Sequence, residues 1–134
     1  MAAGALLSIG LVAGCGSTPA ALAAHTTHVV INGRDAKSDL RVSCTQFGWN
    51  WKIVTVPEAP GFTAMLKAGN SPNPQFVQIR DLGGFTGSYW KYTTGDADLR
   101  IDGSEFRLTG TAVGYTSEQP NKTSSATFAI TTNC

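Results

Sequence analysis

The 134-residue sequence predicts an all-β domain, either an antiparallel β-sandwich or a partly open barrel of about seven to nine short strands. The chain is long enough for one domain with a buried core, since 42% of its residues are hydrophobic. Its 15 glycines and many threonines and serines favour short strands and turns. No segment after the N-terminus keeps a helical hydrophobic period over ten residues.

The expected strands follow one another from residue 29 to the C-terminus. Alternation and turn residues predict strands at 29–32, 40–46, 50–56, 62–67, 75–80, 85–93, 99–101, 105–113 and 123–133. Asn32-Gly33 and Asp102-Gly103 are turn dipeptides, and Pro57 interrupts the third run. Alternation is clearest near the C-terminus, where Phe106 and Leu108 share one face. A short helix over 35–40 or 57–62 is also compatible with the sequence.

The N-terminal residues have the composition of a signal peptide. The first charged residue is Arg34, and residues 5–13 form an apolar run that is too short to span a membrane as a helix. Such a run suits the hydrophobic region of a signal peptide. We therefore expect residues 1–14 to be a signal peptide. Because Met1 is not followed by basic residues, we expect the true start to lie further upstream.

The motif Val12-Ala13-Gly14-Cys15 resembles a bacterial lipobox. The resemblance implies transfer of diacylglycerol to the Cys15 sulfur and cleavage before it, whereas a chance cysteine is the simpler alternative. Two or more acyl chains, such as palmitate, anchor a protein firmly to a membrane. Residues 15–27 are small and uncharged and are expected to form a flexible tether, with the β-domain over 28–134.

The other two cysteines are expected to form a disulfide in an oxidising compartment. Cys44 has the strand parity of Leu40 and Val42, and Cys134 has the parity of Phe128 and Ile130. Both thiols would therefore point toward the core. A catalytic thiol is the alternative, but it needs a nearby histidine, and both histidines lie close to the tether.

Aromatic residues are concentrated in two short segments, 47–51 and 85–92. Core packing is one interpretation. The other is that four of these side chains line one apolar site for an envelope lipid or glycolipid, with carbohydrate stacking as a further alternative. The predicted ligand-binding residues are Trp49, Trp51, Trp90 and Tyr92.

Several function classes are poorly supported. A net charge of +1 offers no basic surplus for a nucleic-acid backbone. We predict no catalytic residues, because residues 29–134 contain no histidine for a Ser-His-Asp set. We predict no metal site or cofactor either: His25 and His28 lack a third ligand, and the aspartates at 96–102 lack the closing glutamate of a calcium loop.

Seven segments, taken in order, carry a family resemblance. They are Val29–Gly33, Val42–Cys44, Thr63–Leu66, Gly69-Asn70, Pro74, Phe106–Ala112 and Phe128–Cys134. Together with the lipobox, they resemble the mycobacterial nineteen-kilodalton lipoprotein antigen family over nearly the whole chain. The chain departs from the family in its short, alanine-rich tether and in its aromatic insertions.

The resemblance implies an exported lipoprotein, held at the outer face of the cell membrane by its lipid anchor, with no enzymatic activity. Its implied partners are the membrane, an envelope lipid or glycolipid, and a host pattern-recognition receptor that recognises the acylated N-terminus. The alternative is a structural or adhesive surface domain without a small ligand, and a hydrolase is the third hypothesis.

Overall fold

The computed structural model describes residues 22–134. The signal peptide, the acylation of Cys15 and half of the predicted tether lie outside the described residues. Within them, the chain is built from β-strands joined by turns, which confirms the predicted fold class. No helix among these residues could cross a membrane.

The described chain contains nine strands, one for each expected run. They are β1 (Thr26–Ile31), β2 (Arg34–Phe47), β3 (Asn50–Val56), β4 (Gly61–Lys67), β5 (Asn73–Leu82), β6 (Phe85–Trp90), β7 (Asp96–Asp102), β8 (Glu105–Thr116) and β9 (Gln119–Asn133). The alternative of a short helix over 35–40 is wrong, because β2 starts directly after the Asn32-Gly33 turn and pairs with β1. Residues 57–60 form a bend and not a helix.

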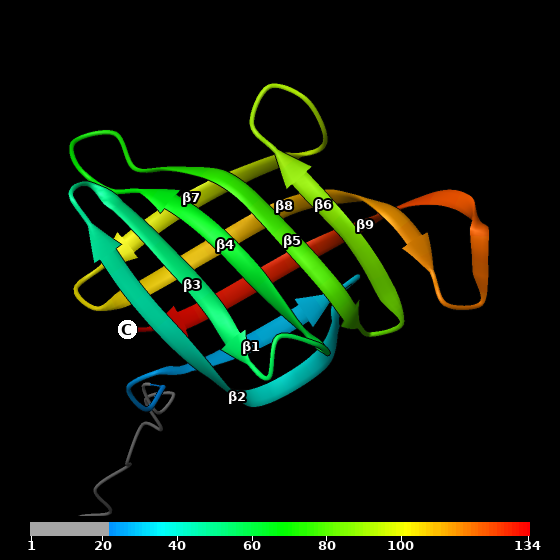
Figure 1. Cartoon of the computed structure of the whole chain (residues 1–134), viewed down its shortest axis with the longest axis horizontal. Helices are drawn as coiled ribbons and strands as arrows, with labels where there is room; N and C mark the ends of the chain where they lie inside the picture. Colours follow the sequence, from blue (N-terminus) through cyan, green and yellow to red (C-terminus); the bar gives the residue numbers. More distant parts are fainter. Residues whose placement is uncertain (1–21) are drawn as a thin grey trace, which may run out of the picture.

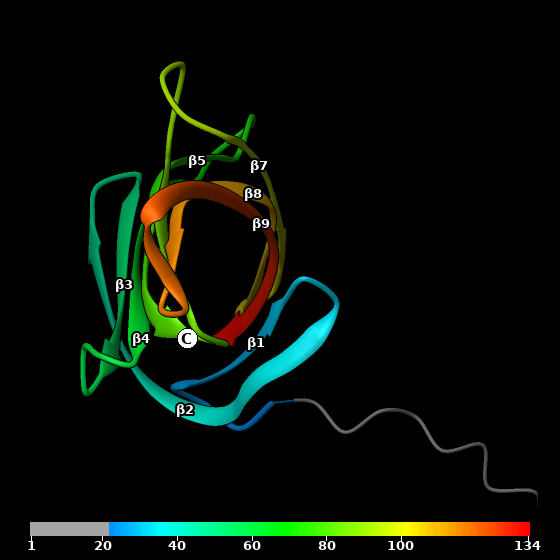
Figure 2. The same ribbon diagram turned by 90° about the vertical axis from the view of Figure 1, so that its right-hand side faces the viewer.

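All nine strands belong to one antiparallel sheet in the order β6-β5-β4-β3-β2-β1-β9-β8-β7. The sheet curls until β6 meets β8, where Phe85–Ser88 pair with Val113–Thr116 (Figures 1 and 2). Strand β7 pairs with the other part of the same edge of β8. The molecule is therefore a partly open barrel. The strands form one continuous sheet and not two separate ones, because β6, at one end of the sheet, also pairs with β8, the neighbour of β7 at the other end.

The inward-facing side chains alternate along each strand and form one core. Val29 of β1, Ile53 of β3, Phe62 of β4, Leu108 of β8 and Ile130 of β9 are all buried in it. Burial of each such side chain contributes about 1.5–3 kcal/mol. Because the core fills the interior of the curled sheet, the side chains that are free to contact a partner lie at the strand ends and on the outer face.

The strands define two ends of the molecule. The proximal end carries the start of β1, the end of β9, the β2–β3 turn, the β4–β5 loop and the β7–β8 turn, on the left of Figure 1. The distal end carries the β1–β2, β3–β4, β5–β6 and β8–β9 turns. The β6–β7 loop projects from the wall between them, since β6 and β7 share one edge of β8.

The N-terminal chain is fixed to the proximal end by hydrogen bonds. The His25 N–H donates to the Asn133 carbonyl at 2.7 Å, and the Val42 N–H donates to the His25 carbonyl at 2.9 Å. The Asn133 side chain also donates to the Leu22 carbonyl at 2.7 Å. The first strand therefore begins at Thr26, two residues before the expected domain start at 28, because β2 and β9 supply partners for this backbone.

The disulfide predicted from strand parity is present. It joins Cys44 near the end of β2 to Cys134 directly after β9, across 90 residues of sequence. Both cysteines pack against the core. The bond thus closes the proximal end beside the entering chain.

One buried phenol gives the fold a predictable alkaline response. Tyr89 is 6% exposed, and its hydroxyl donates to the Pro74 carbonyl at 3.2 Å. Burial raises the pKa of Tyr89, and the nearby Tyr92 and Asp96 raise this pKa further. Since the folded pKa lies above the unfolded value of about 10, the contribution to stability is complete below pH 10 and is lost as the pH rises beyond it.

The Tyr89→Phe variant is expected to lose about 1 kcal/mol at neutral pH, because the Pro74 carbonyl loses its donor. When the pH is raised from 9 to 11, the free energy of unfolding of Tyr89→Phe should fall by less than that of the unchanged protein, because phenylalanine has no hydroxyl to ionise. Urea unfolding at several pH values measures both effects, with Tyr115→Phe on the exposed surface as control. Parallel pH curves for Tyr89→Phe and the unchanged protein would contradict the prediction.

Candidate functional site

The structure does not bring the four predicted ligand-binding residues into one cavity. Trp49 lies in the β2–β3 turn and is 68% exposed. Trp90 ends β6 and is 51% exposed, and Tyr92 lies in the β6–β7 loop and is 95% exposed. Trp51, on β3, is partly buried against the core. Of the four, Trp49 lines the hollow at the proximal end that residues 67–73 complete.

Alternation along a strand would place Trp49 and Trp51 on one face, but the structure places them differently. Trp51 packs against Phe106, with ring centroids 5.3 Å apart, and follows the inward parity of the buried Ile53. Trp49 is outside the strand because the chain turns at Gly48, whose φ of +61° favours glycine, and β3 begins only at Asn50. Counting alternate residues through this turn therefore gave the wrong face for Trp49.

Trp90 and Tyr92 lie apart from the core, on the outer surface. The Trp90 ring stacks on Phe76 of β5 with centroids 4.9 Å apart and planes 21° apart. Tyr92 lies under the Lys91 ammonium, which is 5.0 Å from its ring centroid. The same ammonium donates to the Asn73 side-chain oxygen at 2.8 Å. These contacts connect the β6–β7 loop to the start of β5.

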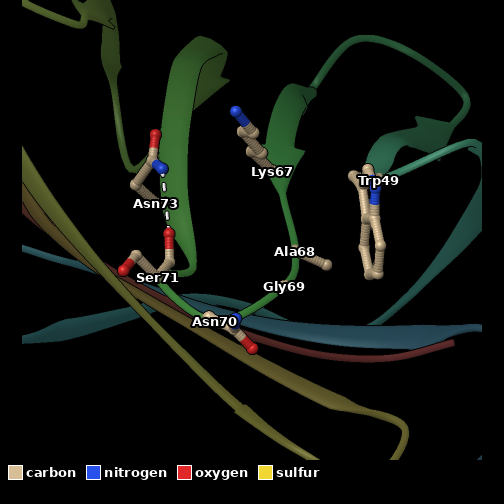
Figure 3. A pocket seen from close by; sticks show the side chains of 7 residues that line it. All are labelled: Trp49, Lys67, Ala68, Gly69, Asn70, Ser71 and Asn73. Carbon is tan, nitrogen blue, oxygen red and sulfur yellow. Dashed lines mark hydrogen bonds between the residues drawn. The ribbon is translucent and has the colours of Figure 1, made fainter.

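The hollow beside Trp49 has a volume of about 450 Å³ and is open to solvent (Figure 3). The β4–β5 loop forms its other wall, and the Ala68 N–H donates to the Trp49 carbonyl at 2.7 Å. Gly69 comes close enough that an added β-carbon would lie 3.6 Å from the indole. The lining residues are Trp49, Lys67, Ala68, Gly69, Asn70, Ser71 and Asn73. The hollow thus combines one indole face with amide, hydroxyl and ammonium groups. This combination suits a polar ligand group that can also stack on the indole ring.

The polar side of this hollow cannot be predicted from the sequence alone. The Gly, Asn and Pro residues of 68–74 predict a turn and nothing more, and Lys67 ends the expected strand 62–67. Their position beside Trp49 follows from β3–β4 pairing, in which Asn50 is opposite Lys67. The presence of a turn was readable from its Gly, Asn and Pro residues, but its neighbour was not.

The titratable groups are dispersed over the surface. His28 Nε2 lies 2.9 Å from the Asp35 carboxylate on the exposed side of β1 and β2. Glu105 is bonded to Arg107 at 2.7 Å beside the β7–β8 turn. Among residues 22–134, no three His, Cys, Asp or Glu side chains gather in an arrangement that could hold a metal ion.

The fold and the surface therefore define a disulfide-closed, all-β domain whose first strand begins at the end that also carries an exposed indole. The family model described as "Mycobacterium 19 kDa lipoprotein antigen" matches residues 20–134. The chain belongs to this family, which confirms the resemblance seen in its sequence.

Curated relatives agree with this assignment. Two proteins named "Putative lipoprotein" are similar over almost the whole chain. The one from Mycobacterium indicus pranii is 35% identical over 135 residues, covering 100% of this chain and 96% of the relative. The one from Mycobacterium avium subsp. hominissuis is 37% identical over 131 residues, covering 97% and 90%. "Lipoprotein LpqH" of Mycobacterium tuberculosis is 34% identical over 113 residues, covering 84% of this chain and 71% of the relative.

Proposed function

We propose that this chain is an exported lipoprotein, acylated on Cys15, that holds a rigid, non-enzymatic β-domain at the outer face of the cell membrane. The observation that carries the proposal is family membership together with the Val12-Ala13-Gly14-Cys15 motif. The relatives bear the names of lipoproteins and not of enzymes, which supports a non-enzymatic role. Host recognition would then act through the acyl chains, as the family resemblance implies.

The geometry supports a domain held through its N-terminus. Leu22 and His25 are hydrogen-bonded to the end of β9, so a pull on the tether would be transmitted directly into the sheet. The Cys44–Cys134 bond ties β2 to the end of the chain at the same point. A disulfide at this position suits an oxidising compartment outside the cytoplasm.

In this proposal, an envelope lipid or glycolipid contacts the outer surface of the domain and does not enter its interior. Core side chains occupy the interior, and Trp51 is among the residues packed against them. Of the predicted aromatic residues, only Trp49 lines a hollow at the proximal end, and this hollow is open and partly polar. This geometry favours a surface that contacts headgroups or glycans over an internal pocket for acyl chains.

Replacement of Cys15 by serine is expected to move the protein from the detergent phase to the aqueous phase of a cloud-point extraction. The reason is that the thioether to diacylglycerol cannot form on a hydroxyl. Intact-mass spectrometry of the unchanged protein from a mycobacterial host should show a chain starting at an acylated Cys15. Ser17→Ala is the matched control and should stay in the detergent phase. A chain that retains Met1–Gly14, or an unmodified Cys15, would exclude the proposed anchor.

A further inference from the structure

The proximal end exposes large aromatic side chains in a single turn. Trp49 is 68% exposed and Phe47 is 46% exposed, and neither is among the side chains packed into the core. An indole has an apolar face and one N–H donor, which makes tryptophan and its neighbours suited to the boundary between water and lipid. The β2–β3 turn exposes the Trp49 indole at the proximal end of the sheet.

The chain enters the domain at this same end. The start of β1, the β2–β3 turn and the β4–β5 loop all lie on the left of Figure 1. Cys15 is seven positions before Leu22, and seven residues span at most about 25 Å even when fully extended. Since the proposed function places the acyl chains of Cys15 in the bilayer, Leu22 is held within about this distance of the lipid surface. The end of the molecule that carries Trp49 is therefore kept near the bilayer.

The charges around Trp49 are of one sign. Lys52 and Lys67 lie on β3 and β4, next to the turn, and the sequence contains no Asp or Glu over 40–57 or 61–80. Acidic residues at the proximal end lie across the sheet at the β7–β8 turn, where Glu105 is already bonded to Arg107. The distal turns and their borders carry both signs, with the acidic residues Asp35, Glu58, Asp81 and Glu118 near the basic residues Arg34, Arg80 and Lys122. The side that bears Trp49 thus complements an anionic surface.

We propose that the proximal end is a membrane-docking surface for the anionic bilayer that holds the lipid anchor. Trp49 and Phe47 enter the headgroup layer, and Lys52 and Lys67 contact lipid phosphates. The hollow between Trp49 and the β4–β5 loop faces the same layer. The inference rests on the proposed anchor, because the tether makes a weak contact effectively intramolecular. Docking then orients the domain, with its distal turns pointing away from the membrane.

Quenching of tryptophan fluorescence by brominated lipid tests the orientation. The acylated full chain is reconstituted in phosphatidylglycerol–phosphatidylcholine vesicles whose acyl chains carry bromine near the headgroup. The chain has three tryptophans, so insertion of Trp49 alone should quench up to about one third of the emission if the three emit equally. This quenching should disappear in Trp49→Phe. It should persist in Trp90→Phe, the control variant, because Trp90 is also half exposed but its ring stacks on Phe76 and does not line the hollow.

Charge variants test the second half of the proposal. Lys67→Gln should reduce the quenching on anionic vesicles and leave it unchanged on phosphatidylcholine alone. Lys122→Gln, near the distal β8–β9 turn, should have no effect on either. Equal quenching in the Trp49→Phe variant and in the unchanged protein would overturn the docking surface. Loss of quenching in Trp90→Phe, with quenching retained in Trp49→Phe, would also overturn it. Flotation with the vesicles is measured in parallel: failure to float refutes the anchor, whereas flotation without quenching refutes docking only.

Discussion

Replacing Cys44 and Cys134 together by serine is expected to lower the free energy of unfolding by roughly 4 to 5 kcal/mol. The bond closes a loop of 90 residues and therefore restricts most of the unfolded domain. In the folded state it joins β2 to the end of β9, on opposite sides of β1 in the sheet. Loss of the bond should loosen the proximal end first, where the entering chain is held by Asn133 and Val42.

Urea unfolding of the double variant measures the effect, with two internal checks. Reductant should destabilise the unchanged protein by a similar amount and should have no effect on the double variant. Tryptophan emission reports on the transition, because Trp51 packs against Phe106 in the core. Equal stability of the oxidised and reduced unchanged protein would show that the bond contributes nothing to the fold.

Replacing Gly114 by alanine is expected to lower the free energy of unfolding by about 3 kcal/mol, at the upper end of typical overpacking costs. An added β-carbon would overlap the Thr86 carbonyl and the Gly87 α-carbon, which are backbone atoms of β6. Gly114 is opposite Gly87 in the short β6–β8 pairing that closes the sheet. The larger side chain must therefore push β6 away from β8 and reopen the sheet.

Gly110→Ala is the matched variant for this prediction, because its β-carbon would instead overlap the Asp96 carbonyl of β7. Amide hydrogen exchange separates the two. Gly114→Ala should accelerate exchange in β6 and Gly110→Ala should accelerate it in β7. Gly103→Ala, in the open β7–β8 turn, meets no atom within 4 Å, so its cost is the backbone strain of a φ of +60° in that turn, and exchange in β6 should stay unchanged. Unchanged exchange in β6 of Gly114→Ala would contradict the proposed role of this glycine.

The sequence by itself determined the strands, the disulfide and the family. Alternation of apolar residues placed nine strand-like runs, each of which overlaps a strand of the structure. The parity of Cys44 and Cys134 placed both thiols on the core side, where they are bonded. The strands and the sides of the thiols depend only on the two-residue period of a strand and on local turn residues such as Asn32-Gly33, so they can be read without knowing which strands are neighbours. The family is read from its segments in their order along the chain.

Only the tertiary structure decided how the aromatic residues are used. Parity counting failed for Trp49, because the turn at Gly48 interrupts the strand before it. The hollow needs the β4–β5 loop beside the β2–β3 turn, and the close approach at Gly114 needs β6 against β8. The hollow forms where loops from two different hairpins come together. The close approach at Gly114 forms where two strands that are not consecutive in the sequence pair. Local periodicity reports which side of a strand is buried, but the neighbour of each strand is chosen by packing of the whole sheet.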